Sequence, residues 1–344
     1  MTAEGTYAPP RAARTGYRRQ RTRLQLPLWA TVVLWVVVAG LGLVAAMRLF
    51  AWDSFDLFAI LNTVTAFIYL PAWIVVVVAA VGKRYVLAGA ALVIVVLQIL
   101  FMLPELTAAQ PIPAWATTAP TLKLFDANVY DMNPSMAGYA TEIEAYQPQL
   151  LTMEEAVPSD VTQLKASGAL AHLPYTVQIK RDDPQAFLIA CKYPLTGVSI
   201  AYLYDRPLIV KMTIQLPTGP RPLWVVHTTA PVPGSFAEWK GDVAAIGSQV
   251  RQRGAAGLLL VGDFNSTWGN KGFRQILAAG MTDGAAARAR PFEMTWSQTK
   301  PIIPPIVRID HVLTGAGVTV TAIGTMAGPG SDHRDVQATV AFRL

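Results

Sequence analysis

Polar residues suited to metal-assisted chemistry follow a short apolar segment near residue 260. The segment 257–261 is apolar throughout and leads into Gly-Asp-Phe-Asn, so that Asp263 and Asn265 come directly after it. A short apolar run of this kind predicts a buried strand that delivers two polar side chains to one edge of a sheet. A carboxylate and an amide at such an edge are residue types that the metal-assisted hydrolysis of a phosphate ester needs.

Similar polar residues end or begin other apolar segments along the chain. Each alone is compatible with an ordinary polar residue at a strand end that faces water, but three of the four histidines lie in these segments. The exception is His172, which we interpret as a loop residue. The residues in question are Asn128, Glu154, Glu155, His227, Asp310, His311, Asp332 and His333.

This set of side chains predicts a site for a hard divalent cation. Carboxylate and amide oxygens are the ligands that Mg²⁺ takes in proteins. Hydrolysis of a phosphate ester also needs charge neutralised on phosphate oxygens, an in-line nucleophile and help for the leaving group. We therefore expect Mg²⁺ as the cofactor, with Mn²⁺ as an alternative. Tight zinc binding is disfavoured, because the sequence has neither a His-Glu-x-x-His motif nor paired cysteines.

The elements that must position these residues are short strands interleaved with helices. Strands and helices do not alternate strictly along the chain. This order of elements predicts two packed sheets with helices on their outer faces. One helix has clear ends: Ser235 and Glu238 predict a capping box, and Gly254 predicts the C-terminal stop. The predicted strands cover 122–128, 150–154, 187–191, 208–215, 223–228, 257–261, 307–313, 318–323 and 336–342, and the predicted helices cover 137–146, 158–167, 235–253 and 270–279.

The first 104 residues have the pattern of membrane-spanning segments. Charged residues are absent between Arg23 and Arg48, between Asp56 and Lys83, and between Arg84 and Glu105. A helix needs about 20 apolar residues to cross the hydrocarbon core of a bilayer. We therefore predict three transmembrane helices, at 25–47, 57–82 and 85–104, with a kink in the second at Pro71. A cleaved signal peptide is the alternative for the first, and its length and the two spans that follow disfavour it.

The basic residues predict the orientation and the domain boundaries. Six arginines precede the first span, and Lys83 and Arg84 join the second and third. Loops rich in Lys and Arg usually lie on the cytoplasmic side of a membrane. We therefore expect a multi-pass protein of the cell membrane with a cytoplasmic N-terminus and an extracytoplasmic C-terminal domain. The predicted parts are a basic cytoplasmic tail (1–24), three transmembrane helices (25–104), a Pro/Ala/Thr-rich linker (105–120) and a catalytic domain (121–344).

Net charge disfavours bulk nucleic acid as a partner of the C-terminal domain. The chain carries a net charge of +6, but residues 105–344 hold 19 basic and 19 acidic residues. Binding to nucleic acid rests largely on phosphate neutralisation by Lys and Arg, although a local basic groove stays open as an alternative. The single cysteine, Cys191, lies in an apolar run and is expected to be buried and inert. Trp239, Trp268 and Trp296 are interpreted as packing residues.

With these motifs in order, residues 121–344 resemble the endonuclease/exonuclease/phosphatase superfamily. The resemblance rests on Phe-Asp-Ala-Asn, Met-Glu-Glu, Val-Val-His-Thr, Gly-Asp-Phe-Asn-Ser, Ile-Asp-His and Ser-Asp-His-Arg, in that order along the chain. It implies a four-layer α/β sandwich of two packed mixed sheets flanked by helices. Three spans before an exported domain of this kind also resemble the VanJ-type membrane proteins linked to glycopeptide resistance.

The superfamily resemblance implies roles for the polar residues that bind metal and water. Glu155 is the expected main metal ligand, supported by Asn128 and Asp332. Asp263 is expected to orient or deprotonate the attacking water, and Asn265 to hold a phosphate oxygen. These assignments predict that the metal and the nucleophile are held by residues from different segments of the chain.

The remaining roles fall to two histidines, an aspartate and an arginine. His333, paired with Asp310, is expected to contact the phosphate or to transfer a proton, and His227 is its counterpart on the other side of the phosphorus. Arg206 joins Asn265 among the expected substrate-binding residues. Two departures from the family pattern, Glu154 in place of Gln and Asp335 in place of Pro, are expected to alter only the rim of the site.

The leading functional interpretation is a membrane-anchored, Mg²⁺-dependent phosphoesterase that acts outside the cytoplasmic membrane. A short linker and a neutral domain favour a lipid-linked phosphate, a pyrophosphate or a phospholipid as substrate, with membrane lipids as partners. The alternatives are an extracellular metal-dependent nuclease and a non-catalytic binding or sensor protein on the same fold. The sequence leaves the oligomeric state, the exact substrate and the bond cleaved open.

Overall fold

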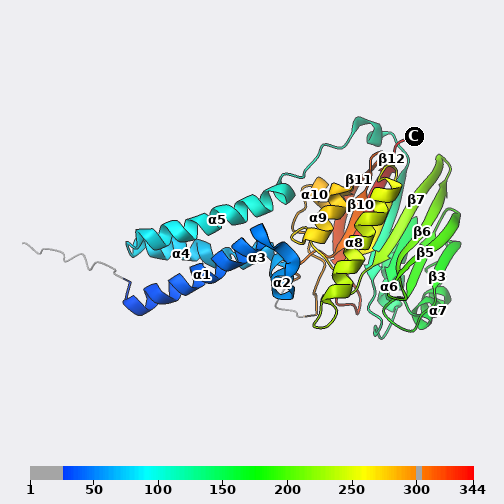
Figure 1. Ribbon diagram of the computed structural model, residues 1–344. Helices are drawn as coiled ribbons and strands as arrows, with labels where there is room; N and C mark the ends of the chain where they lie inside the picture. The colour runs from blue at the N-terminus through cyan, green and yellow to red at the C-terminus, as the bar shows by residue number, and fades with distance from the viewer. Residues whose placement is uncertain (1–25, 300–303) are drawn as a thin grey trace, which may run out of the picture.

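The computed structural model of the chain describes residues 26–299 and 304–344. Residues 28–106 form a helical region, and residues 121–342 form a domain built on two sheets. The predicted basic tail, residues 1–24, lies outside the described residues. The helical region extends away from the two-sheet domain as an elongated bundle, so the molecule has two distinct parts (Figure 1).

The helical region contains two helices that are long and apolar enough to cross a membrane. Within the described residues these are α1 (Leu28–Phe50) and α5 (Tyr85–Leu106). They pack with α4 (Leu70–Val81) around a core of small and branched apolar side chains, and the three helices lie side by side (Figure 1). Many of their outward-facing side chains are apolar and exposed, among them Val36 and Val86.

The second predicted span, 57–82, is a broken helix. It divides into α2 (Asp56–Thr63), α3 (Thr65–Ile68) and α4, and the part before the break is bent by 82° from the part after it. As a bent pair it forms a third crossing only if the two arms count as one span. The kink predicted at Pro71 is misplaced, because Pro71 occupies the first turn of α4, where a proline fits a helix. α2 lies between the bundle and the two-sheet domain (Figure 1).

The first sheet contains the N-terminal and C-terminal strands of the domain. Its strand order is β11-β12-β1-β2-β4-β3, in which β1 and β2 are parallel and the other neighbours are antiparallel. The register pairs Asn128 with Glu154 across β1 and β2. The bounds are β1 (Thr121–Asn128), β2 (Leu150–Glu154), β3 (Tyr175–Ile179), β4 (Phe187–Cys191), β11 (Val318–Ala327) and β12 (Arg334–Phe342).

The second sheet has the same number of strands and a matching parallel pair. Its order is β5-β6-β7-β8-β10-β9, in which only β7 and β8 are parallel. The register pairs His227 with Asp263 across β7 and β8, and Asp263 with Asp310 across β8 and β10. The bounds are β5 (Leu195–Leu203), β6 (Arg206–Leu216), β7 (Gly219–His227), β8 (Leu259–Asp263), β9 (Thr282–Asp283) and β10 (Asp310–Thr314).

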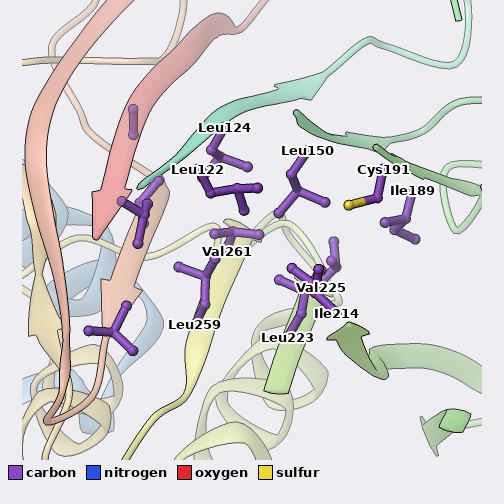
Figure 2. Close-up of a cluster of buried hydrophobic side chains, with 14 of the residues drawn as sticks. Leu122, Leu124, Leu150, Ile189, Cys191, Ile214, Leu223, Val225, Leu259 and Val261 are labelled. Carbon is purple, nitrogen blue, oxygen red and sulfur yellow. The ribbon is translucent and has the colours of Figure 1, made fainter. Parts of the chain in front are cut away.

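Two sheets and four helices make four layers. The inner faces of the sheets meet in a dry apolar core that includes Leu124, Leu150, Val225 and Val261 (Figure 2). On the outer faces, α6 (Ala137–Tyr146) and α7 (Pro158–Ser167) pack on the first sheet, and α8 (Phe236–Arg253) and α9 (Lys271–Ala278) pack on the second. The α/β sandwich of two packed mixed sheets flanked by helices is therefore confirmed. The remaining short helices are η1 (Trp52–Ser54), η2 (Ala114–Thr117) and α10 (Gly284–Ala287).

The structure corrects several sequence-based expectations, among them the capping box, the linker bounds and three strands, β3, β5 and β9, that were not predicted. α8 begins after Ser235, but the Ser235 hydroxyl donates to the carbonyls of Ala230 and Val232 and does not cap the helix, so the predicted capping box is wrong. The predicted linker 105–120 is also shorter than expected. Glu105 and Leu106 still belong to α5, and η2 occupies part of the remainder.

Candidate active site

Four parallel strand ends and two antiparallel strand starts meet at one edge of the sandwich. β1 and β2 end at Asn128 and Glu154 in the first sheet, while β7 and β8 end at His227 and Asp263 in the second. β10 runs antiparallel to β8 and therefore starts at this edge, with Asp310. β12 runs antiparallel to β1 and starts here too, directly after His333. Sheet topology alone thus gathers residues that are far apart in the sequence.

A cleft of about 440 Å³ opens at this edge. Seven of the predicted site residues line it, namely Glu155, Arg206, His227, Asp263, Asn265, Asp332 and His333. The other two, Asn128 and Asp310, are buried beneath the cleft floor and contact residues that line it. The structure therefore brings together all nine residues to which the sequence assigned a role, whereas Glu154 and His311 of the initial polar set do not line the cleft.

Glu155 is held at the mouth of β2 by polar contacts from the first sheet. Asn128 Nδ2 donates to Glu155 Oε1 over 2.8 Å, and the backbone N–H of Asp131 donates to Glu155 Oε2 over 3.1 Å. Glu155 has a φ of 60°, a left-handed conformation that is uncommon for a residue with a long side chain. Burial raises the pKa of Glu155. The unusual backbone and the two donors aim this carboxylate into the cleft.

Asp263 and Asn265 form a tight polar turn at the end of β8. The Asn265 N–H donates to Asp263 Oδ1 over 2.7 Å, and Asn265 Nδ2 donates to the Thr228 carbonyl over 3.0 Å. Asp263 also accepts from Asn128 Nδ2 at 3.1 Å, which joins the two sheets at the site. Burial, with Asp310 close by, raises the pKa of Asp263 to about 6. Asp263 is therefore an acid–base group poised near neutral pH.

The residue before Asp263 must be a glycine. Gly262 has a φ of 126°, and a Cβ there would lie 2.1 Å from the Val226 carbonyl oxygen of the neighbouring strand. A side chain at this position would push β8 away from β7, because that distance is far inside van der Waals contact. The close approach of the two strands sets the separation between His227 and Asp263.

His333 and Asp310 form a buried ion pair at the base of the cleft. His333 Nδ1 lies 3.0 Å from one carboxylate oxygen of Asp310 and 3.2 Å from the other. Burial alone would lower the pKa of His333, but Asp310 and Asp263 outweigh it and raise the pKa to about 10. His333 therefore carries a positive charge at neutral pH, with Nε2 3.8 Å from Asp263 Oδ2.

His227 also lies near Asp263 but differs from His333 in charge. Its Nε2 lies 3.5 Å from Glu155 Oε1 and 3.7 Å from Asp263 Oδ2. Burial lowers the pKa of His227 despite these carboxylates. One histidine of the site is thus neutral and the other cationic, a separation that suits one as a hydrogen-bonding partner and the other as a proton donor.

Two departures from the family pattern lie inside the protein and not on the rim. Glu154 and Asp335 are each 0 % exposed, so the expectation of rim positions is wrong. Successive side chains at the end of β2 point in different directions, so that Glu155 faces the cleft and Glu154 points into the protein. Within residues 26–299 and 304–344, neither carboxylate oxygen of Glu154 has a hydrogen-bond partner. Burial, together with Asp126 and Asp310, raises the pKa of Glu154 well above its usual value, which favours the uncharged acid.

Some cleft residues were not predicted or were interpreted differently. Trp239 and Trp268 are buried as expected, but Trp296 is 40 % exposed, lines the cleft and donates Nε1 to Asp332 Oδ2 over 2.8 Å. Arg206 lines the cleft, where its guanidinium pairs with Glu238 at 3.3 Å. The unpredicted lining residues are Tyr130, Asp131, Pro184, Gln185, Thr228, Thr229, Ala230 and Glu238.

The unpredicted residues come mostly from loops that carry no periodic pattern. Only their position directly after a polar strand end, as for Tyr130 and Thr228, signals a role. The fourth histidine, His172, contacts the Pro148 carbonyl and is not among the cleft residues, as the sequence predicted.

The oxygen donors of the cleft fit a divalent cation. Among the described residues, neither Glu155 nor Asp332 forms an ion pair with Lys or Arg; the charged group nearest to Asp332 is His333, whose Nε2 lies 3.9 Å from Asp332 Oδ1. Asp263, Asp310 and His333 also place potential ligand atoms within 4.8 Å of one another. His333 Nδ1 is already paired with Asp310 at 3.0 Å, and a ring nitrogen suits a hard cation less well than an oxygen does. The carboxylate and amide oxygens around Glu155 are the better match to a hard cation.

Comparison with known proteins agrees with this geometry. The model of the Endonuclease/Exonuclease/phosphatase family matches residues 124–333, which is more than half of the chain. No relative was found among the curated proteins. Among solved structures, TDP2 from D. rerio, complexed with a single-strand DNA product, superposes with a TM-score of 0.53 at 15% identity, covering 64% of this chain and 98% of that one.

Two bacterial structures are similar to the same extent. A family protein from Bacteroides thetaiotaomicron has a TM-score of 0.53 at 15% identity and covers 66% of this chain and 100% of its own. The 3′ phosphatase NExo from Neisseria, bound to a product DNA hairpin, has a TM-score of 0.52 at 17% identity, with coverages of 65% and 100%. At such identities the likeness shows the shared fold. With its family match and its cleft, the chain belongs to the endonuclease/exonuclease/phosphatase family and is a metal-dependent phosphoric ester hydrolase.

Proposed function

We propose that this protein is a membrane-anchored phosphoesterase that uses Mg²⁺ to hydrolyse a phosphate ester or pyrophosphate of a lipid-linked or phospholipid substrate. The observation that carries the proposal is the arrangement around Asp263. A carboxyl group with a pKa of about 6 lies near a neutral histidine and a cationic one, beside two carboxylates, Glu155 and Asp332, that face the cleft without a Lys or Arg partner in the described residues. This arrangement supplies a proton acceptor, a proton donor and a cation site within one cleft.

Glu155, supported by Asn128 and Asp332, would hold the cation. When bound, Mg²⁺ would neutralise charge on the phosphate oxygens and polarise the phosphorus–oxygen bond. Asn128 contributes in this structure by donating to both Glu155 and Asp263, which fixes one carboxylate relative to the other. Asn265 Nδ2, which now donates to the Thr228 carbonyl, is placed to donate to a phosphate oxygen instead. Arg206 is proposed to contact the remainder of the substrate.

The proton transfers follow from the charges of the side chains. Asp263, ionised above pH 6, orients a water molecule and accepts its proton as the oxygen attacks phosphorus. His333, kept protonated by Asp310, donates its Nε2 proton to the oxygen of the leaving group as the phosphorus–oxygen bond breaks. His227, which is neutral, hydrogen-bonds to the phosphoryl group from the other side. The proton gained by Asp263 and the one lost by His333 balance over a turnover.

A membrane-borne substrate is favoured by the N-terminal helices. α1 and α5 are long and apolar enough to cross a bilayer, and the domain packs directly on the same helical region. A cytoplasmic N-terminus and an extracytoplasmic domain complete the proposal, as the basic flanks predict. The resemblance to VanJ-type proteins favours a lipid-linked cell-wall intermediate. Within residues 26–299 and 304–344, Arg206 is the one Lys or Arg that lines the cleft, which suits a small headgroup better than a long polyanion.

The test is phosphate release from a polyprenyl pyrophosphate by the full-length protein in detergent with Mg²⁺. The matched controls are Asp263→Ala and His333→Ala, both folded by circular dichroism. We expect release by the wild type and a loss of at least about 100-fold in either variant, because each removes a proton-transfer group. Release that persists in both variants would show that another site or a contaminant does the chemistry.

A nuclease is the second candidate, because the structures from D. rerio and Neisseria were solved with DNA products. Plasmid nicking in the same reaction mixtures separates the two candidates. Nicking by the wild type that is lost in Asp263→Ala, without phosphate release from the lipid, would make this protein a surface nuclease. Phosphate release without nicking supports the proposed lipid substrate.

A further inference from the structure

The loop that follows Asn265 is held by the helical region. Residues 266–271, here called the 266–271 loop, lead from the catalytic turn into α9. They lie against residues 48–65, here called the junction segment, which comprises the end of α1, η1, α2 and the start of α3. The contact joins parts of the chain more than 200 residues apart, because the hydrogen bond from Arg48 to Gly269 spans 221 positions. The loop directly follows Asn265, which lines the active-site cleft.

Gly269 is the centre of the contact. Its carbonyl accepts from Arg48 Nη1 over 2.7 Å and from Trp52 Nε1 over 2.9 Å. A Cβ on Gly269 would lie 2.0 Å from the Asn62 carbonyl oxygen, so the two backbones approach too closely for any side chain. Arg48 is 5 % exposed and its guanidinium lies 4.9 Å from the ring centroids of both Trp52 and Phe101. A buried guanidinium donating to one carbonyl fixes the loop in both position and direction.

Further buried hydrogen bonds extend the contact to both ends of the loop. Asp53 Oδ2 accepts from the Lys271 N–H over 2.6 Å, at the first turn of α9. Asn270 Nδ2 donates to the Ala59 carbonyl over 3.1 Å, and Thr267 Oγ1 donates to the Thr63 carbonyl over 3.2 Å. Asn270 is fully buried and Thr267 nearly so. Because each polar group is satisfied only in this arrangement, the network specifies one geometry.

A second contact from the helical region reaches the same loop. Arg308 donates to Glu105 at the end of α5 and, over 2.9 Å, to Asp283. Asp283 in turn lies 2.9 Å from His311 Nδ1, and His311 Nε2 lies 3.0 Å from the Ser266 carbonyl. All five residues are buried. Two separate segments of the helical region, the junction segment and the end of α5, therefore converge on the residues that directly follow Asn265.

Asn265 depends on this support because its own conformation is strained. It has a φ of 45°, and its carbonyl accepts from Trp239 Nε1 over 3.0 Å. A non-glycine residue in the left-handed region costs about 1 kcal/mol or more and persists only where its surroundings hold it. A purely apolar contact would suffice to keep the domain attached to the helices. Buried polar contacts aimed at one carbonyl are explained better by a need for exact placement of the loop.

We propose that the junction segment is a positioning element of the active site: by holding the 266–271 loop, it fixes Asn265 relative to Asp263 and His333. The proposal rests on the phosphoesterase function proposed above. It makes part of the helical region a structural component of catalysis, although none of residues 48–65 lines the cleft. Misplacement of a catalytic group by about 1 Å costs on the order of 100-fold in rate.

The test is Gly269→Ala in the full-length protein, reconstituted in lipid nanodiscs. The matched control is Gly324→Ala in β11, where an added Cβ meets no atom within 4 Å and φ is not left-handed. We expect kcat per folded molecule to fall by about 10- to 100-fold in Gly269→Ala, with KM and the Mg²⁺ half-saturation within about twofold of wild type. A merely structural role would reduce the amount of folded enzyme and leave kcat per folded molecule unchanged.

Hydrogen exchange provides a readout that does not need activity. Amides in the peptide that covers 264–271 are expected to exchange at least about tenfold faster in Gly269→Ala than in Gly324→Ala, a change of about 1.4 kcal/mol in local opening. Equal exchange in the two variants overturns the inference. If wild type releases no phosphate from any lipid tested, the proposed function fails while the exchange result still decides the inference. Should Gly269→Ala not fold, Trp52→Phe removes a single hydrogen bond to Gly269 and applies the same test.

Discussion

At the scale of single residues, the site is defined by how burial and neighbouring charges set protonation. His333 and His227 are both buried and both near Asp263, yet only His333 has a carboxylate within hydrogen-bond distance on its far nitrogen. That one contact with Asp310 separates a cationic imidazole from a neutral one. The difference assigns opposite roles to two residues that look equivalent in the sequence.

Asp310→Asn is expected to move the basic limb of the pH–rate profile to lower pH. With Asp310 present, the pKa of His333 is about 10, so the protonated form persists across neutral pH and is lost only as pH approaches 10. Removal of a carboxylate partner lowers the pKa of a histidine by about 1–3 units. Measured kcat should therefore fall with rising pH well below pH 10 in the variant. Profiles that coincide in shape would contradict the role of His333 as the acid.

Glu154→Gln is expected to stabilise the protein at alkaline pH. An acid whose pKa is raised by folding retains a proton that the unfolded chain releases above about pH 4.3, so its contribution to stability is lost as pH rises. Glutamine has no proton to lose. The variant and the wild type should therefore have similar unfolding free energies near pH 4, with the variant gaining about 1–3 kcal/mol by pH 8. Chemical denaturation at the two pH values measures this, and a gain that is the same at both would contradict it.

At the scale of elements, the site residues were predictable because they end buried strands. Apolar runs such as 150–154 and 257–261 can be identified as buried strands from their composition, and a polar residue at the end of each run is easily recognised. The strands that sequence reasoning missed, β3, β5 and β9, all lie at the edges of their sheets. An edge strand packs on one neighbour only, so its sequence carries a weaker apolar pattern, as the mostly exposed β5 illustrates.

The break between α2 and α4 was not predictable from hydropathy. Residues 57–82 have the composition of one apolar run, and single polar residues at the bend make contacts with distant parts of the chain. Asn62 and Thr65 accept from Arg48, and Thr63 donates to Asn270. A polar residue inside an apolar run is ambiguous in sequence, because it signals a break only when a partner exists elsewhere in the fold.

Gly262→Ala tests how strictly the end of β8 is constrained. Gly254→Ala is the matched control, because Gly254 also has a positive φ, of 81°, but an added Cβ there meets no atom within 4 Å. We expect about 1–2 kcal/mol of destabilisation in the control from backbone strain alone. Gly262→Ala should cost clearly more and abolish turnover, since its Cβ would lie 2.1 Å from the Val226 carbonyl. Equal losses of stability in the two variants would mean that β8 can shift without harm.

At the scale of the whole molecule, charge and hydropathy divide the chain into parts with different surroundings. The arginines before residue 24 and the apolar helices account for the net charge of +6 and the high hydrophobic fraction, while the domain is neutral overall. The family and the sandwich could be predicted from ordered motifs. The packing of the domain on the helical region could not, because the residues that form it, such as Arg48 and Gly269, carry no motif.

The orientation of the chain can be tested with reporters fused after Leu344. With the N-terminus in the cytoplasm and three crossings, a periplasm- or exterior-specific reporter at Leu344 should be active, and a cytoplasm-specific one inactive. Fusion after Lys83, between α4 and α5, should give the opposite result and serves as the internal control. If α2, α3 and α4 do not make a full crossing, the reporters at Lys83 and at Leu344 should each give the opposite of the expected result. The number of crossings would then be two.

The junction between Gly269 and the helical region has a kinetic consequence. If the substrate is the proposed membrane lipid, a domain fixed to the helical region by buried polar contacts would meet it within a thin layer of constant height. For such an enzyme the relevant concentration is the number of substrate molecules per area of lipid, and not per volume of solution. For enzyme and substrate in the same vesicles, dilution of the vesicles in buffer should leave the rate of substrate hydrolysis per enzyme unchanged. Addition of inert lipid, which lowers the number of substrate molecules per area of membrane, should reduce that rate.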